Sequence, residues 1–277
     1  MIEILKAILF GIVEGITEWL PVSSTGHIIL LDEFLELKGT DAFKSMFDVV
    51  IQLGAILAVI VLFFHKLNPF APSKSKEEKG KTWNLWFKVC VAILPSGILG
   101  VLFDDILEEY LHHGVPVAIA LIVYGIAFIL VERRNQGKYA RAIADVHDIG
   151  WKTAVLIGCF QVLSLIPGTS RSGSTILGAI LLGVGRSAGA EFSFFMAIPT
   201  MLGASAIKLL DFFLETGFGM ASSELAVLMV GMVVSFVVSM LVIKGLMEYV
   251  RKHSFSVFGI YRIILGIIVL AYFLILV

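Results

Sequence analysis

The chain has 277 residues, of which 58% are hydrophobic and 16% are charged, and its formal net charge is −1 at pH 7. Soluble domains contain about 45–50% apolar and about 25% charged residues, so this composition predicts an integral membrane protein. Nothing in the near-neutral net charge suggests a protein that binds nucleic acid. Cys90 and Cys159 stand singly in apolar segments, which predicts neither a disulfide framework nor a zinc site.

The first apolar stretch, residues 1–36, is broken in its middle by the polar sequence PVSSTGH at residues 21–27. Glu3 near its start and two further acids before the break argue against a cleaved signal peptide. Pro21 is expected to end one helix, and a second helix is expected to begin within the break.

Six later segments are each long and apolar enough to cross about 30 Å of hydrocarbon. They are expected at residues 47–64, 85–103, 115–132, 187–210, 226–243 and 256–277. Between the third and the fourth lies another apolar stretch, residues 150–184, which is broken by PGTSRSGST. The sequence therefore predicts six transmembrane helices and two interrupted elements.

The loops between these segments differ in charge. Three of them are rich in Lys and Arg, whereas DDILEEYLHH and DFFLETGFGMASSE contain neither residue. Because basic loops stay in the cytoplasm, the six spans alternate correctly only if residue 1 and the first break lie on the external side. Either interrupted stretch would disturb this alternation if it crossed the membrane, so each is expected to form a re-entrant helix pair.

The two breaks also resemble each other. Aligning Gly26 with Gly173, 147 residues later, places Glu14 on Gln161 and superimposes the two polar sequences. The expected fold is therefore one all-α polytopic membrane domain made of two repeats, residues 1–135 and 150–277. Each repeat holds a re-entrant pair and three spans, and since three is odd the second repeat is inverted. Inverted repeats place their site near the midplane, where the broken elements meet.

Two acids precede the first break. Glu14 and Glu18 are four residues apart and therefore project from one face of a helix. A charged side chain at the bilayer centre costs about 2.5–3.5 kcal/mol, so these acids and Arg171 are expected to face a polar cavity, a ligand or one another. A Glu–Arg pair that only joins the two halves is the structural alternative.

Hydroxyl side chains gather at both breaks. In the first, one of Ser23, Ser24 or Thr25 is expected to cap the helix that follows, because these residue types accept hydrogen bonds from free N–H groups of a first turn. In the second break, Thr169 or Ser170 is expected to do the same. Two helix N-termini that converge form a site for an anion, and the neighbouring arginine is suited to phosphate.

The segments EGITEWLPVSSTGH and PGTSRSGST resemble the two signature segments of the bacterial undecaprenyl-diphosphate phosphatase family, and the similarity extends along nearly the whole chain. The resemblance implies hydrolysis of a C55 polyprenyl diphosphate to its monophosphate, which recycles a carrier lipid for cell-wall synthesis in the bacterial cytoplasmic (inner) membrane. It also implies bacitracin resistance and dependence on a divalent metal. The matching residues of this chain are Glu14, Glu18, Ser23, Ser24, Thr25, His27, Ser170, Arg171 and Ser172.

These residues suggest a mechanism. Ser24 is the expected nucleophile and Glu18 its general base, while Arg171 and the helix N-termini would stabilise the transferred phosphoryl group. His27 would protonate the leaving oxygen or help to hydrolyse a phosphoserine. Glu14, together with Glu18, is expected to hold Mg²⁺ or Ca²⁺. The hydroxyls expected to bind substrate are those of Ser23, Thr25, Ser170, Ser172 and Thr175. Direct attack by a metal-activated water is the competing mechanism.

A secondary transporter is the alternative function, because inverted repeats and intramembrane charges also characterise carriers. A flippase for a polyprenyl phosphate would use the same midplane pocket. The clustering of Ser24, Glu18 and His27 favours hydrolysis, which needs these groups. The acid-phosphatase-like superfamily is excluded, because Leu177 stands where its second motif requires histidine.

Other polar residues have less certain surroundings. Asp48 and Gln52 face either the pocket or a neighbouring helix. Lys208, Lys244 and Arg262 lie near the ends of spans and are expected to extend toward the membrane surface. The site is expected to open to the external side, with a polyprenyl diphosphate and membrane lipid as partners, no nucleic acid, and a homodimer left open.

Overall fold

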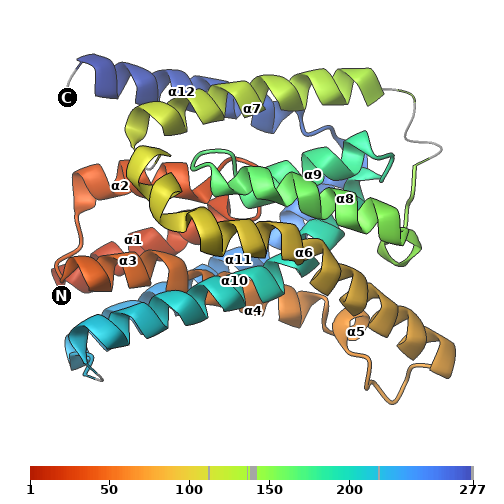
Figure 1. The fold of residues 1–277 in the computed structure, drawn as a ribbon, viewed down its shortest axis with the longest axis horizontal. Helices are drawn as coiled ribbons and strands as arrows, with labels where there is room; N and C mark the ends of the chain where they lie inside the picture. Colours follow the sequence, from red (N-terminus) through yellow and green to blue (C-terminus); the bar gives the residue numbers. More distant parts are fainter. Residues whose placement is uncertain (112, 136, 138–141, 218, 276–277) are drawn as a thin grey trace.

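The computed structural model describes residues 1–111, 113–135, 137, 142–217 and 219–275. Regular structure in these ranges is helical (Figure 1), apart from an isolated bridge between Ile143 and Val184. Lys138 and Arg141 of one basic loop, and the last two residues of the final expected span, lie outside the described residues. The all-α class is therefore confirmed for the described part of the chain.

Six helical segments in the described residues are long and apolar enough to cross a membrane, as expected. Their bounds are Asp41–Leu62, Lys76–Phe103, Gly114–Asn135, Arg186–Thr216, Ser222–Lys252 and Ser256–Ile275. The first consists of α3 (Asp41–Val50) and α4 (Gln52–Leu62); the others belong to α6 (Lys76–Leu111), α7 (Gly114–Asn135), α10 (Arg186–Thr216), α11 (Ser222–Lys252) and α12 (Ser256–Ile275). A short helix, α5 (Phe64–Leu67), connects the first span to α6.

The first interrupted stretch forms an antiparallel helix pair, α1 (Ile2–Thr17) and α2 (Ser24–Leu35). The backbone N–H of Lys38, just after α2, donates to a carboxylate oxygen of Glu3 at 2.9 Å. The start of α1 and the end of α2 therefore lie side by side at one end of the molecule (Figure 1). The break between them lies in the interior.

The second interrupted stretch has the same arrangement. It contains α8 (Trp151–Val162), the 3₁₀ turns η2 (Val146–Asp148) and η3 (Leu163–Leu165), and α9 (Arg171–Leu181). The backbone of Ile143, ahead of α8, accepts a hydrogen bond from Gly185 N–H at 2.8 Å and donates to Gly183 O at 3.0 Å, just beyond α9. This pair therefore begins and ends at the opposite end of the molecule from α1 and α2 (Figure 1).

Glycines let the interrupted pairs approach the long helices closely. A Cβ on Gly158 of α8 would meet Ala92 O of α6 at 1.9 Å, and one on Gly11 of α1 would meet Gly231 O of α11 at 2.6 Å. Any larger side chain at these positions would separate the helices. Consequently α1 packs on α11 and α8 packs on α6.

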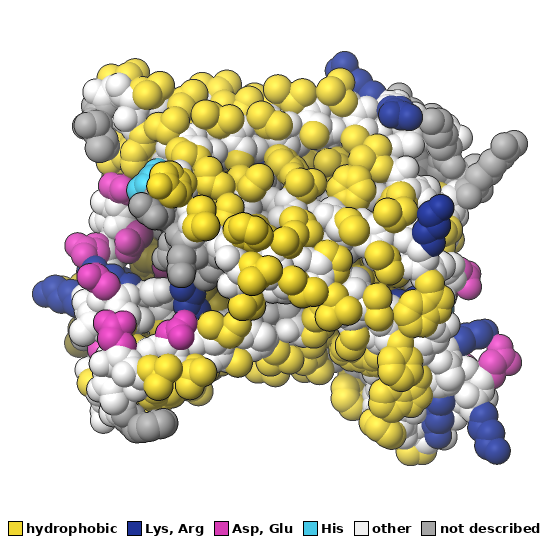
Figure 2. All heavy atoms as spheres, viewed as in Figure 1, with side chains coloured by type: hydrophobic (Ala, Val, Ile, Leu, Met, Phe, Trp, Pro, Cys, Tyr) yellow, Lys and Arg dark blue, Asp and Glu magenta, His cyan; other side chains and the backbone are white. Residues whose placement is uncertain are grey.

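The outer surface and the two ends differ in chemistry. Large apolar side chains such as Leu130, Val233 and Leu241 are exposed on the flanks of the spans, where a soluble protein would bury them. Figure 2 shows this apolar band, with Lys and Arg predominating at the end where α6 begins and most of the visible Asp and Glu at the other end. The distribution is that of a multi-pass membrane protein.

Candidate active site between the two interrupted helix pairs

Both breaks end in a serine with unusual backbone geometry. Ser23 has φ 75° and Ser170 has φ 71°, a region that non-glycine residues rarely occupy. Each side chain accepts a hydrogen bond from the backbone N–H three residues later: Ser23 from Gly26 at 3.2 Å, and Ser170 from Gly173 at 3.1 Å. Among the candidate capping hydroxyls, the structure therefore selects these two.

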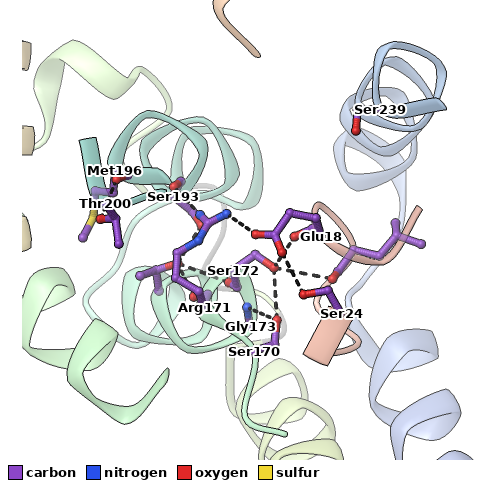
Figure 3. Close-up of polar contacts among 12 residues, drawn as sticks. Glu18, Ser24, Ser170, Arg171, Ser172, Gly173, Ser193, Met196, Thr200 and Ser239 are labelled. Carbon is purple, nitrogen blue, oxygen red and sulfur yellow. Dashed lines mark hydrogen bonds and ion pairs between the residues drawn. The ribbon is translucent and has the colours of Figure 1, made fainter. Parts of the chain in front are cut away.

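Glu18 joins the two motifs. Its carboxylate is buried, with the residue only 4% exposed. One oxygen, Oε2, accepts a hydrogen bond from Ser24 Oγ at 2.8 Å, and the other, Oε1, accepts one from Arg171 Nη2 at 2.7 Å (Figure 3). The acid, the hydroxyl and the guanidinium predicted from sequence are thus assembled in one place, although 153 residues separate the acid from the arginine.

Arg171 is held on several sides. Its Nη1 donates to the backbone carbonyl of Ser193 on α10 at 2.8 Å, and its guanidinium lies 5.7 Å from the centre of the Trp19 ring. Its Nε has no partner among the described residues. Ser172, the next residue, donates to Glu18 O at 3.1 Å and lies 3.2 Å from Ser170 Oγ. The arginine is therefore fixed in direction and keeps one unused donor.

Two further predicted site residues, Thr175 and His27, lie near this centre and are held by partners other than Ser24 and the Glu18 carboxylate. Thr175 is buried, donates from Oγ1 to Arg171 O at 2.9 Å and lies 2.6 Å from Ser193 Oγ. His27 has Nδ1 2.7 Å from Ser23 O and Nε2 2.7 Å from the hydroxyl of Tyr261. Because a carbonyl only accepts, Nδ1 carries the proton and Nε2 accepts from the tyrosine. Neither residue contacts the hydroxyl of the expected nucleophile in this arrangement.

An acidic cavity of about 560 Å³ lies beside the centre. Its lining residues are Glu14, Thr25, Ile28, Ile29, Asp32, Glu33, Glu36, Asp48, Val49 and Gln52. Asp48 and Gln52 thus line this pocket. The sequence alone had left open whether they face the pocket or a neighbouring helix. Glu14 is 1% exposed, and its Oε1 has no hydrogen-bond partner among the described residues. A buried, unpaired carboxylate oxygen is suited to a proton or a cation.

The chain's own ligands for a metal ion are few. In the described ranges, no group of three or more His, Cys, Asp or Glu side chains is placed to hold one. Both oxygens of Glu18 are already hydrogen bonded, whereas Glu14 keeps one oxygen free. Glu14 and Glu18 therefore fit a divalent cation only in part, because they provide fewer oxygen ligands than Mg²⁺ or Ca²⁺ requires.

The expectation that Arg262 extends to the membrane surface is wrong. The residue is fully buried; its Nη1 donates to Pro21 O at 3.1 Å and its Nη2 to Gly168 O at 2.7 Å. Its guanidinium therefore contacts both breaks. A signal was present in the sequence, since Gly259 and Gly266 lie on the same helical face and mark the packed side of α12.

Comparison with known proteins gives a consistent result. The model of the family described as bacitracin resistance protein BacA matches residues 7–268, which include both breaks. An undecaprenyl-diphosphatase from Enterococcus faecalis is 59% identical over 271 residues, covering 97% of this chain and 96% of that protein. Undecaprenyl-diphosphatase 1 from Clostridioides difficile (strain 630) is 57% identical over 277 residues, covering 100% and 98%. A third, from Limosilactobacillus fermentum, is 55% identical over 273 residues, covering 99% and 98%.

Proposed function

The chain belongs to the bacitracin resistance protein family BacA, and we propose that it hydrolyses undecaprenyl diphosphate to undecaprenyl phosphate and inorganic phosphate. Such a reaction would recycle the carrier lipid of cell-wall synthesis. The observation that carries the proposal is the contact of Ser24 and Arg171 with the two oxygens of one buried carboxylate, Glu18. Phosphoryl transfer needs a nucleophile, a base that activates it and a cation that neutralises the phosphoryl charge. The hydroxyl of Ser24, the carboxylate of Glu18 and the guanidinium of Arg171 are suited to these three roles.

In the proposed reaction, the diphosphate displaces Arg171 from Glu18, and the guanidinium turns to the oxygens of the terminal phosphoryl group. Glu18 is then free to take the proton of Ser24 while Ser24 Oγ attacks the terminal phosphorus. The bond from that phosphorus to the bridging oxygen breaks, and the lipid monophosphate leaves. Water then attacks the phosphoserine, which releases inorganic phosphate and restores the hydroxyl.

Other groups would support these steps. At the starts of α2 and α9, Ser23 and Ser170 occupy one N–H group each, those of Gly26 and Gly173. The remaining N–H groups of these first turns would stabilise the phosphoryl oxygens. Thr25, which lines the cavity, would bind the same oxygens. Ser172 and Thr175 are both fully buried, which favours roles in holding Glu18 and Arg171 in place over direct contact with substrate. His27 would take up a proton at Nε2, which accepts from the Tyr261 hydroxyl in this structure, before it could protonate the leaving oxygen; as a neutral imidazole it would help to hydrolyse the phosphoserine as a base.

We propose Mg²⁺ or Ca²⁺ as the cofactor, which Glu14 and Glu18 would hold in part and which would supply positive charge to neutralise the diphosphate. Replacing Glu14 by Gln is expected to raise the metal concentration for half-maximal activity at least about tenfold, because even loss of a residue that supports a metal ligand weakens binding by this factor. Glu14→Gln should also weaken metal binding in calorimetry. Glu248→Gln, an exposed acid on α11, is the control. Unchanged metal dependence and binding in Glu14→Gln would remove this residue from the metal site.

We further propose that residues 1–135 and 150–277 are inverted repeats whose interrupted stretches are re-entrant pairs. In support, α2 and α9 start 147 residues apart, at Ser24 and Arg171, which is the shift that aligns the motifs. In each pair, both ends lie at one end of the molecule, and the two pairs enter from opposite ends (Figure 1). The charge distribution favours an opening of the site on the external side. Activity confined to substrate in the cytoplasmic leaflet of oriented vesicles would contradict that orientation.

The function is tested by phosphate release from a short-chain polyprenyl diphosphate, with purified wild-type protein in detergent and added Mg²⁺ or Ca²⁺. We expect one phosphate per diphosphate, with the lipid monophosphate as the other product and no release from the monophosphate itself. A folded protein that releases no phosphate would refute the hydrolase and favour the alternative, a flippase for the polyprenyl phosphate.

A further inference from the structure

Arg262 is a fully buried cation whose role is not explained by packing alone. It lies on the face of α12 that also carries Gly259, and a Cβ on that glycine would meet Gly125 O of α7 at 2.6 Å. The close approach of the two helices leaves the arginine facing inward, with its guanidinium 5.5 Å from the centre of the Tyr124 ring. A charged group in such a place is retained only where its donors are needed.

The two carbonyls that Arg262 binds occupy equivalent places in the two motifs. Pro21 lies two residues before the capping Ser23, and Gly168 lies two residues before the capping Ser170. A planar guanidinium with one hydrogen bond to each sets both the distance and the relative orientation of the turns. Because these turns lead directly into α2 and α9, the bonds also place the first residues of both helices, Ser24 and Arg171.

The first turn of α9 is adapted to this arginine. A Cβ on Gly173 would lie 3.2 Å from Arg262 Nη1, so a glycine at this position lets the guanidinium approach the helix start. Among the side chains that the structure describes, no carboxylate forms an ion pair with Arg262. Its hydrogen-bond partners are main-chain carbonyls, which favours a role in fixing the backbone over neutralising a buried acid.

We propose that Arg262 is a positioning residue, which sets the distance between Ser24 and Arg171 by joining the two breaks, and which does not touch the substrate. This inference rests on the proposed hydrolysis of a polyprenyl diphosphate. Misplacement of reacting groups acts on the chemical step more than on binding. A change at Arg262 should therefore lower kcat and leave KM nearly unchanged.

The test is Arg262→Lys, which keeps the charge but replaces a guanidinium with two donating nitrogens, Nη1 and Nη2, by a single ammonium. We expect kcat to fall about 30- to 100-fold, as for a misplacement of about 1 Å, with KM within about threefold of wild type. The melting temperature of each preparation is measured in the same detergent, and rates refer to folded protein. Arg251→Lys, at the exposed end of α11, is the matched control and should equal wild type.

Each outcome decides the inference. A wild-type kcat in Arg262→Lys would overturn it, as would a rise in KM with kcat unchanged. If the lysine variant does not fold, Arg262→Gln supplies a neutral side chain with amide donors. For this variant too we expect a lower kcat and a nearly unchanged KM. A wild-type protein that releases no phosphate would instead refute the proposed function, and the inference with it.

Discussion

Replacing Ser24 by alanine is expected to lower kcat for phosphate release at least about 1,000-fold, since removal of a nucleophile that acts together with its base typically has effects of this size or larger. Ser24 Oγ donates to Glu18 Oε2 at 2.8 Å, so the base already lies within reach of the proton it would remove. Folding should be little affected, because the backbone cap at this break is supplied by Ser23.

The measurement is steady-state phosphate release, combined with rapid acid quenching to trap a phosphoserine at position 24 in the wild-type protein. Ser45→Ala, a half-buried serine on α3, is the matched control and should retain wild-type activity. Near-normal release by Ser24→Ala would exclude the covalent mechanism and favour direct attack by a metal-activated water, with Glu18 as its base.

Replacing Arg171 by methionine is expected to lower kcat about 100- to 10,000-fold, a range that includes the loss of one stabilising donor or of an arginine that neutralises a transferred phosphoryl group. The variant should also be destabilised by about 3–5 kcal/mol, because Glu18 would remain as an unpaired buried charge. Arg171→Lys should restore part of the stability but little of the activity, since an ammonium cannot bind two phosphoryl oxygens side by side.

The double variant Glu18→Gln/Arg171→Met separates catalysis from structure. With both charges removed, the free energy of unfolding should recover most of what the single change lost. Phosphate release should stay at or below the level of Arg171→Met, because the base is now missing as well. Recovery of activity together with stability would mean that the ion pair only joins the two halves of the protein, which is the structural alternative.

Hydropathy was sufficient to locate the six membrane-spanning segments in the sequence. Each of the six predicted segments overlaps a helix long enough to cross a membrane, because burial of apolar side chains in lipid depends on the local sequence alone. The segment expected at 47–64 begins earlier, at Asp41, since Thr40 caps α3 through a bond from Phe43 N–H at 3.1 Å. Such polar starts of helices carry no hydropathy signal.

The candidate site was only partly predictable. Capping hydroxyls were expected at both breaks, but the choice of Ser23 and Ser170 follows from positive φ angles that the sequence does not specify. Asp48 could be assigned to the cavity only once the structure placed α3, which carries it, and α2 around the same cavity. The position of a residue along a helix gives its face, but not which element that face meets.

The sequence by itself determined the class of protein, the six spans and the residue types of the two motifs, because composition, hydropathy and helix capping act between near neighbours in the chain. Only the tertiary structure decided that Glu18 meets Arg171, and that Arg262 is buried against both breaks. The physical reason is that a charged side chain in a membrane protein can either reach the surface or find polar partners inside. That choice depends on carbonyls and carboxylates brought close by helices far away in sequence.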